Sequence, residues 1–218
     1  NGLDGTSSVA VSPDGKHVYA TGYVDDGLAA FARDAATSAL SFLEVETQAV
    51  GGVSGLDGPN EVVVSPDGKH VYVASEVSDS IAVFARNATT GSLSYVEAEA
   101  NGVAGVSGLD GARTLALSPD GAYLYAGGFV DSAIAVFERD AATGALGFAA
   151  AVVDGVGGFD GLGGVASLLV RNDGRRVYAT ARSEDAIGVF ARDPATGALA
   201  FLDAIRAGAD GYLLKKSR

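Results

Sequence analysis

Apolar and polar positions alternate along this chain in short runs separated by turn-forming residues. In the run at 8–12, Val9 and Val11 fall on one face of an extended segment, and Pro-Asp-Gly follows at 13–15. Alternation of this kind, bounded by turn residues, is typical of a half-buried β-strand. Further runs follow at 16–22, 28–33 and 39–47. The pattern predicts four strands joined by tight turns, which is an antiparallel meander.

The same pattern repeats at a fixed period of 53 residues. The Ser-Pro-Asp-Gly turn at 12–15 recurs at 65–68 and 118–121, and in a weaker form as Arg-Asn-Asp-Gly at 171–174. A repeat of this kind indicates units that bury their faces against their neighbours, and four-stranded units of this length stack radially. We therefore predict an all-β fold, a β-propeller built from four 53-residue four-stranded antiparallel blades.

The repeat also predicts how the chain is divided. We expect one propeller domain over residues 1–212 and a C-terminal tail at 213–218, because the pattern breaks into Tyr-Leu-Leu-Lys-Lys at 212–216. Three assemblies agree with four copies: a closed four-bladed ring, a homodimer that completes an eight-bladed ring, or a segment of a longer chain. The expected blades lie at about 2–53, 54–106, 107–159 and 160–212.

Charge and composition restrict the partners. The chain has 27 acidic and 15 basic residues, a formal net charge of −12, and no cysteine. A strongly negative surface repels nucleic acid, whose binding requires clustered Lys and Arg. Without cysteine there are no disulfides and no thiolate metal ligands. No run approaches the roughly 18 apolar residues of a membrane span, so we expect neither nucleic acid nor a membrane span.

Both histidines occupy one position of the repeat. His17 and His70 come directly after the Asp-Gly turn, where the other copies carry Tyr123 and Arg176. A position that accepts Tyr and Arg is not expected to hold a metal ligand or a general base. We predict that both histidines are exposed residues of the scaffold.

Two kinds of segment resemble a known family. Val-Tyr-Ala-Thr at 18–21 and 177–180, and Val-Tyr-Val-Ala at 71–74, resemble YVTN-type propeller repeats. The segment 83–93, Val-Phe-Ala-Arg-Asn-Ala-Thr-Thr-Gly-Ser-Leu, resembles lactonase-type seven-bladed propellers, which include 6-phosphogluconolactonase-like proteins. The resemblance covers residues 2 to about 212 and implies a propeller that hydrolyses a sugar lactone. The chain differs from that family in having four copies where seven are expected.

Candidate functional residues are those that differ between the copies on a loop that can face a ligand. Two columns of the repeat qualify, the entry to the first strand and the end of the second, and both belong on one rim of a propeller. A carboxylate facing a guanidinium there could bind a sugar acid or polarise a lactone carbonyl. The alternative is that these are drifted positions forming surface ion pairs. The candidate ligand-binding residues are Tyr23, Asn60, Glu61, Glu76, Arg113, Phe129 and Arg182.

The sequence supports a metal site or a catalytic site less well than it supports the ligand-binding rim. The Gly- and Asp-rich connections at 51–58 and 157–161 loosely resemble calcium-binding repeats, but each offers only one or two carboxylates. We expect no cofactor and no metal, with calcium in these turns as the alternative. No helical zinc motif, phosphate-binding loop or nucleophile elbow is present, so we assign no catalytic residue.

Our main interpretation is a non-enzymatic propeller that serves as a binding or interaction module. We expect it to be secreted or surface-associated, in an extracellular or periplasmic location, with a protein, carbohydrate or small-molecule ligand. One alternative is a lactonase-like hydrolase of a sugar lactone, which rests on the resemblance. Another is a structural segment of a larger propeller or extracellular assembly.

Overall fold

The computed structural model describes residues 2–207, and the regular structure of these residues consists of β-strands. The end of the last predicted blade, 208–212, and the predicted tail, 213–218, lie outside the described residues. Among residues 2–207, no helix is long and apolar enough to cross a membrane. The strands are β1 (Thr6–Val11), β2 (His17–Gly22), β3 (Gly27–Arg33), β4 (Leu40–Thr47), β5 (Pro59–Val64), β6 (His70–Ser75), β7 (Ser80–Arg86), β8 (Leu93–Ala100), β9 (Ala112–Leu117), β10 (Tyr123–Gly128), β11 (Ala133–Arg139), β12 (Leu146–Val153), β13 (Val165–Val170), β14 (Arg176–Ala181), β15 (Ala186–Arg192) and β16 (Leu199–Arg206).

The strands form four separate sheets, and each sheet is one antiparallel meander in chain order. Blade 1 is β1–β4, blade 2 is β5–β8, blade 3 is β9–β12 and blade 4 is β13–β16. The observed strands agree with the predicted ones because turn residues set their limits: Gly15, for example, takes a φ of 69° in the turn between β1 and β2. The prediction of an all-β propeller arrangement of four four-stranded blades is confirmed.

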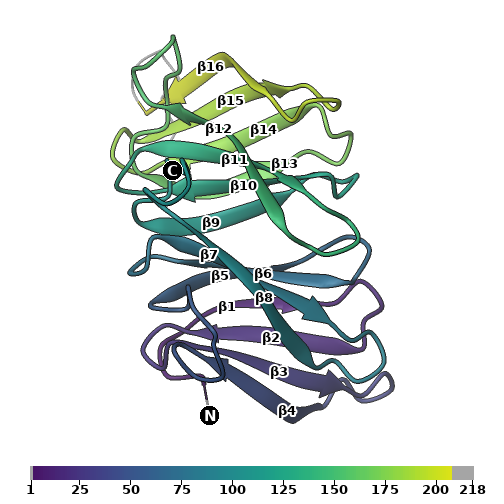
Figure 1. The fold of residues 1–218 in the computed structure, drawn as a ribbon. Helices are drawn as coiled ribbons and strands as arrows, with labels where there is room; N and C mark the ends of the chain where they lie inside the picture. The colour runs from purple at the N-terminus through teal and green to yellow at the C-terminus, as the bar shows by residue number, and fades with distance from the viewer. Residues whose placement is uncertain (1, 208–218) are drawn as a thin grey trace, which may run out of the picture.

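The four blades stack in an open arc (Figure 1). The first strands of successive blades lie side by side, β1 against β5, β5 against β9 and β9 against β13. Blades 1 and 4 lie at opposite ends of the stack, at the purple and yellow ends of the ribbon. Of the assemblies that the sequence leaves open, the closed four-bladed ring is therefore not the one that residues 2–207 form.

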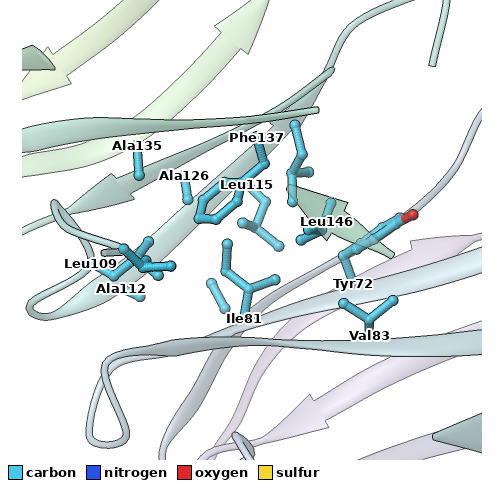
Figure 2. Packing of buried hydrophobic residues seen from close by; sticks show 13 residues of the cluster. Tyr72, Ile81, Val83, Leu109, Ala112, Leu115, Ala126, Ala135, Phe137 and Leu146 are labelled. Carbon is cyan, nitrogen blue, oxygen red and sulfur yellow. The ribbon is translucent and has the colours of Figure 1, made fainter. Parts of the chain in front are cut away.

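Apolar clusters fill the space between neighbouring blades. Figure 2 shows the cluster between blades 2 and 3, where Ile81 and Val83 of β7 face Leu115 and Phe137 of blade 3. Two similar clusters join blade 1 to blade 2 and blade 3 to blade 4. Fully burying one such side chain contributes about 1.5–3 kcal/mol. The core therefore lies between the sheets, and each blade depends on its neighbours for burial.

A polar contact, which we name the interblade latch, accompanies each apolar cluster. In blade 3, the Arg139 Nε donates to the Tyr72 hydroxyl of blade 2 at 2.7 Å, and Nη2 contacts the Asp67 carboxylate at 2.9 Å. Nη2 also lies 2.7 Å from the Nδ1 of His70, and Nη1 donates to the Gly121 carbonyl at 3.1 Å. Because a guanidinium only donates, His70 accepts through Nδ1 and is held in the neutral form.

The latch repeats at the other two interfaces. Arg86 contacts Tyr19 and Asp14, and Arg192 contacts Tyr125 and Asp120. Each of the three arginine side chains is at most 2% exposed, whereas the aspartates are about one-third to one-half exposed. A buried guanidinium is tolerated only when its donors are satisfied, so the latch fixes how neighbouring blades align.

The prediction that His17 and His70 are exposed is wrong. Their exposed fractions are 4% and 3%. Each ring lies under the latch arginine of the next blade and against a glycine of that blade, Gly91 for His17 and Gly144 for His70. The residues that cover each histidine come from the next copy of the repeat, so the turn position alone gives no sign of them.

The latch arginine is expected to contribute measurably to stability. Arg139→Ala removes a buried cation and its hydrogen bonds to Tyr72 and Asp67, so we expect the free energy of unfolding to fall by about 2 kcal/mol. Lys69→Ala is the control, because Lys69 is exposed in the same turn and blade 3 has Ala122 at that position. Urea unfolding measures both variants, and equal losses would contradict the proposed role of the latch.

The buried histidines are expected to make stability depend on pH. Burial, followed by Arg139, lowers the pKa of His70; Asp67 and Asp140 oppose this and Lys69 adds to it. Burial and Arg86 likewise lower the pKa of His17. Below pH of about 6.5 the unfolded chain therefore binds more protons than the folded one, and stability falls as the pH falls.

The size of that fall can be isolated by substitution. Each histidine contributes at most about 1.4 kcal/mol per pH unit. We expect His17→Tyr combined with His70→Tyr to flatten the loss of stability between pH 7.5 and 5, because Tyr123 fills this position in blade 3. Burial tends to raise the pKa of Asp67, but the hydrogen bonds from Ser65 and Arg139 have the larger effect and lower this pKa to about 2. Asp67 therefore does not titrate between pH 7.5 and 5. Unchanged pH dependence in chemical denaturation would refute the assignment.

Candidate functional site

The first strand of each blade begins with a β-bulge. In blade 3, Ala112 pairs with Gly128 and Thr114 pairs with Gly127, so Arg113 is the extra residue between them. A bulge leaves its extra residue unpaired and re-aims the side chain, and bulges are frequent beside functional sites. The same shift occurs at Ser7, Asn60 and Ala166. One of the two variable columns identified in the sequence is therefore the bulge position.

Four of the seven candidate residues meet at the rim between blades 2 and 3. Arg113 Nη2 forms an ion pair with Glu76 Oε1, and the guanidinium carbon lies 4.3 Å from the centroid of the Phe129 ring. The Asn60 side-chain amide donates to Glu76 Oε2 at 2.5 Å. The Arg113 and Glu76 side chains are 25% and 26% exposed, so the pair is partly shielded from water. We call Asn60, Glu76, Arg113 and Phe129 the rim cluster.

Arg113 retains capacity to donate. Its Nε is buried and has no hydrogen-bond partner among residues 2–207. Guanidinium carries five N–H donors, of which the Glu76 carboxylate accepts only one in the contacts described above. Glu76 and the Phe129 ring hold the group in place, so it is a fixed cation with unused donors. Such a group suits a carbonyl or carboxylate oxygen.

Glu61 lies on the neighbouring first strand. Its Oε2 accepts a hydrogen bond from the Leu115 backbone N at 2.7 Å, and Leu115 is two residues beyond Arg113 on β9. Burial raises the pKa of Glu61, and the bond from Leu115 offsets part of that rise. In the same column, Ser8 and Thr114 accept from the next blade in the same way. Glu61 therefore has a scaffold role, which the sequence did not indicate, while its second oxygen keeps lone pairs for a ligand.

The other two candidates lie outside the rim cluster. Tyr23 belongs to blade 1, where its ring lies beside Gly58, as the Phe129 ring lies beside Gly164. Arg182 belongs to blade 4, where its backbone N donates to the Gly164 carbonyl at 3.0 Å and its side chain is exposed. All seven candidates stand at the predicted positions of the repeat, but the structure joins only four of them directly.

An acidic group between blades 3 and 4 was not identified from the sequence. One oxygen from each of Asp154, Asp160 and Glu184 lies within 4.8 Å of the others. Arg206 donates to Asp160 Oδ2 at 3.0 Å and to Glu184 Oε2 at 2.8 Å. The signal was present in the repeat, because Arg206 stands where the other copies have Thr47, Ala100 and Val153.

The acidic group has the features of an ion-pair network more than those of a calcium cage. Calcium takes six to eight oxygen ligands, whereas here the guanidinium of Arg206 already supplies positive charge among three carboxylates. Asp160 belongs to one of the turns in which calcium was the alternative expectation. In the other turn, burial and the neighbouring Asp26 carboxylate raise the pKa of Asp57. Calcium binding by these turns stays an untested prediction.

Two open pockets lie away from the rim cluster. One, of about 280 Å³, is lined by residues 101–102 and 106–108 together with Asp131 and Val153. The other, of about 310 Å³, lies on the outer face of blade 4 and is lined by Leu169, Tyr178 and Ile187 among others. Neither of these two pockets is lined by a residue of the rim cluster.

Comparison with known proteins relates this geometry to one family. The sequence profile described as "Lactonase, 7-bladed beta-propeller" matches residues 1–108 and 100–211. No curated protein sequence matches the chain.

Solved structures agree with the profile. The periplasmic gluconolactonase of Pseudomonas aeruginosa is 28% identical, with a TM-score of 0.72 over 93% of this chain and 54% of that one. A Lactobacillus plantarum protein is 26% identical, with a TM-score of 0.75 over 92% of this chain and 57% of that one. A candidate 6-phosphogluconolactonase of Bacteroides uniformis is 24% identical, with a TM-score of 0.77 over 92% and 55%, and shows the fold alone. The chain spans about half the length of these proteins.

Proposed function

The chain belongs to the lactonase family of seven-bladed β-propellers, and from this premise we propose that its blades contribute to a hydrolase that opens a sugar lactone. The interpretation as a non-enzymatic module is not supported, because the family and the 28% identical gluconolactonase favour the alternative. The observation that carries the proposal is the rim cluster, in which a fixed guanidinium stands beside the strand that bears Glu61.

Opening a lactone requires a base and a positive group at the carbonyl. Water adds to the carbonyl carbon while Glu61 takes one of its protons, and the carbonyl oxygen becomes an oxyanion. Arg113 donates hydrogen bonds to that oxyanion. The bond from the carbonyl carbon to the ring oxygen then breaks, and the proton held by Glu61 passes to the ring oxygen. The product is a hydroxy acid, which ionises in water.

The other residues of the rim cluster position the cation. Glu76 accepts from Arg113 through one oxygen and from Asn60 through the other, so its carboxylate is fixed at both ends. The Phe129 ring lies against a face of the guanidinium. A donor that is fixed before the reaction begins needs no reorganisation as charge develops, which is the main advantage of such sites.

Charge favours an uncharged lactone over a phosphorylated one. The chain carries a net charge of −12. Among residues 2–207, the cations at this rim are Arg113, which Glu76 already neutralises in part, and the exposed Arg182. A phosphate group is usually bound by several Arg or Lys side chains or by a helix N-terminus. A neutral aldonolactone needs neither of these.

Substitution at the rim tests the proposal. We expect the purified chain to hydrolyse D-glucono-1,5-lactone faster than the spontaneous reaction, and Arg113→Ala to lower kcat/KM by about 100-fold or more through loss of the oxyanion donor. Lys69→Ala, in an exposed turn between β5 and β6, is the control and is expected to keep full activity. The assay is acid release in a pH-stat. Hydrolysis no faster than the spontaneous rate, or full activity in Arg113→Ala, would overturn the proposal.

The pH profile tests the base. Burial raises the pKa of Glu61 above its ordinary value, so we expect kcat/KM to increase with pH as Glu61 loses its proton, with a midpoint above pH 4.5. Glu61→Gln keeps an oxygen that can accept from the Leu115 backbone N but removes the base. That variant is expected to lose both the rate and the acidic limb of the profile. An unchanged acidic limb in Glu61→Gln would exclude Glu61 as the base.

A further inference from the structure

The pocket of about 280 Å³ lies between blades 2 and 3, where the connection from β8 to β9 meets the turn between β10 and β11. Its polar side chains are those of Asn101 and Ser107, from the connection, and Asp131, from the turn. Val153, the last residue of β12, also lines it. We call this space the interblade pocket. It is separate from the rim cluster, so what it binds does not depend on the proposed lactone chemistry.

The next repeat shows the same arrangement with a cation in place. Asp154, Asp160 and Glu184 stand 53 residues beyond the three polar residues of the interblade pocket, and Arg206 stands 53 residues beyond Val153. There the Arg206 guanidinium donates to Asp160 at 3.0 Å and to Glu184 at 2.8 Å. At the interblade pocket a valine replaces that arginine, so none of the residues that line it supplies a cation.

The two sites share one backbone framework. Asn101 Oδ1 accepts a hydrogen bond from the Leu109 backbone N at 3.3 Å, as Asp154 Oδ1 does from the Leu162 backbone N at 3.0 Å. The last residues of β12 and β16 both pair with the first residue of the strand before them. Side chains at positions 153 and 206 therefore leave their sheets at equivalent points, beside equivalent loops.

Charge around the interblade pocket favours a cation. Asp131 Oδ2 accepts a hydrogen bond from the Asp110 backbone N at 3.0 Å, and among residues 2–207 Asp131 makes no ion pair. Burial raises the pKa of Asp110, and the nearby carboxylates of Asp79 and Asp131 raise it further. These three acidic groups give the region a negative potential, which attracts positive ligands.

We infer that the interblade pocket binds a guanidinium group from outside the chain, carried by a small solute or by an arginine of a peptide. The group takes the position that the Arg206 guanidinium has in the next repeat, with its N–H donors directed to the Asp131 carboxylate and the Ser107 hydroxyl. A planar guanidinium matches a carboxylate with two parallel donors, whereas an ammonium group acts as a point charge. The pocket therefore favours guanidinium over ammonium.

Titration followed by NMR tests the ligand class. Methylguanidinium is expected to shift the backbone amide signals of Gly102, Ser107 and Asp131, with a dissociation constant on the order of 1–10 mM, because one partly exposed carboxylate attracts only modestly. Methylammonium is expected to bind at least about fivefold more weakly. Equal binding of the two cations, or of a neutral methyl glucoside, would overturn the inference, and so would the absence of shifts well above that concentration range.

A second titration distinguishes the two sources of the group. N-acetyl-arginine methylamide carries the same guanidinium on a peptide backbone. Binding at least about tenfold tighter than that of methylguanidinium supports an arginine of a peptide, because the peptide part then adds contacts of its own. Equal binding of the two probes supports a small solute. If neither probe shifts the three amide signals, the pocket does not bind guanidinium.

Removing the charge tests the role of Asp131. Asp131→Asn keeps an oxygen that can accept from the Asp110 backbone N but removes the negative charge, and is expected to weaken methylguanidinium binding by at least about tenfold. Asp25→Asn is the matched control: Asp25 is the blade 1 counterpart, it accepts from the Asp4 backbone N at 3.0 Å, and it does not line the interblade pocket. Equal weakening in both variants would indicate general attraction to an acidic surface and refute the site.

Filling the pocket tests its position. Val153→Arg restores the residue type of the next repeat, so its own guanidinium is expected to pair with Asp131 and abolish methylguanidinium binding, with an unchanged circular dichroism spectrum. Val153→Ala leaves the interblade pocket open and is expected to bind as the unaltered chain does. Undiminished binding in Val153→Arg would contradict the inference, because the ligand would then lie elsewhere.

Discussion

The packing of one blade on the next is the interaction on which this structure depends. A four-stranded sheet has two faces, and each blade here carries apolar side chains on both, so no blade can bury its own core. The apolar clusters supply most of the burial but have little directional preference. The latch supplies direction, since a buried guanidinium must find its tyrosine and aspartate acceptors in one alignment. Burial and alignment together fix the rim, because Glu76 and Arg113 come from different blades.

The predictable part of the fold follows from local chemistry. Turns with Asp and Gly, alternating apolar residues and a strict period determine the strands and their order, and these agree with the structure. What the sequence does not predict depends on contacts between copies. His17 lies 69 residues from Arg86, which covers it, and its own turn looks exposed. From the sequence, Glu61 is expected to be a free carboxylate on the rim. In the structure, the Leu115 N–H of β9 donates a hydrogen bond to it. The burial of both residues is determined by the neighbouring blade.

The candidate site likewise has a part that the sequence predicts and a part that depends on contacts between blades. The two variable columns could be placed on one rim because the period aligns them, and the structure agrees on that position. The bulge that re-aims Asn60 and Arg113 has no clear sequence signal, since the residues before and after it pair normally. The acidic group around Arg206 belongs to a third column of the repeat, in which Arg206 replaces small or apolar residues of the other copies. Departures from a repeat are informative at every column, including those that face a neighbouring loop.

The position of the rim cluster separates the chemistry from closure of the ring. Asn60, Glu76, Arg113 and Phe129 all belong to the two central blades, and the interface that holds them is complete within one arc. The outer faces of blades 1 and 4, at the two ends of the arc, lie one blade further out on each side. Closing the ring therefore does not create the guanidinium site, but it does surround it, and a surrounded site excludes water and strengthens each charge that acts on a substrate. An arc alone can hold the groups that react; a ring gives those groups the environment in which they are effective.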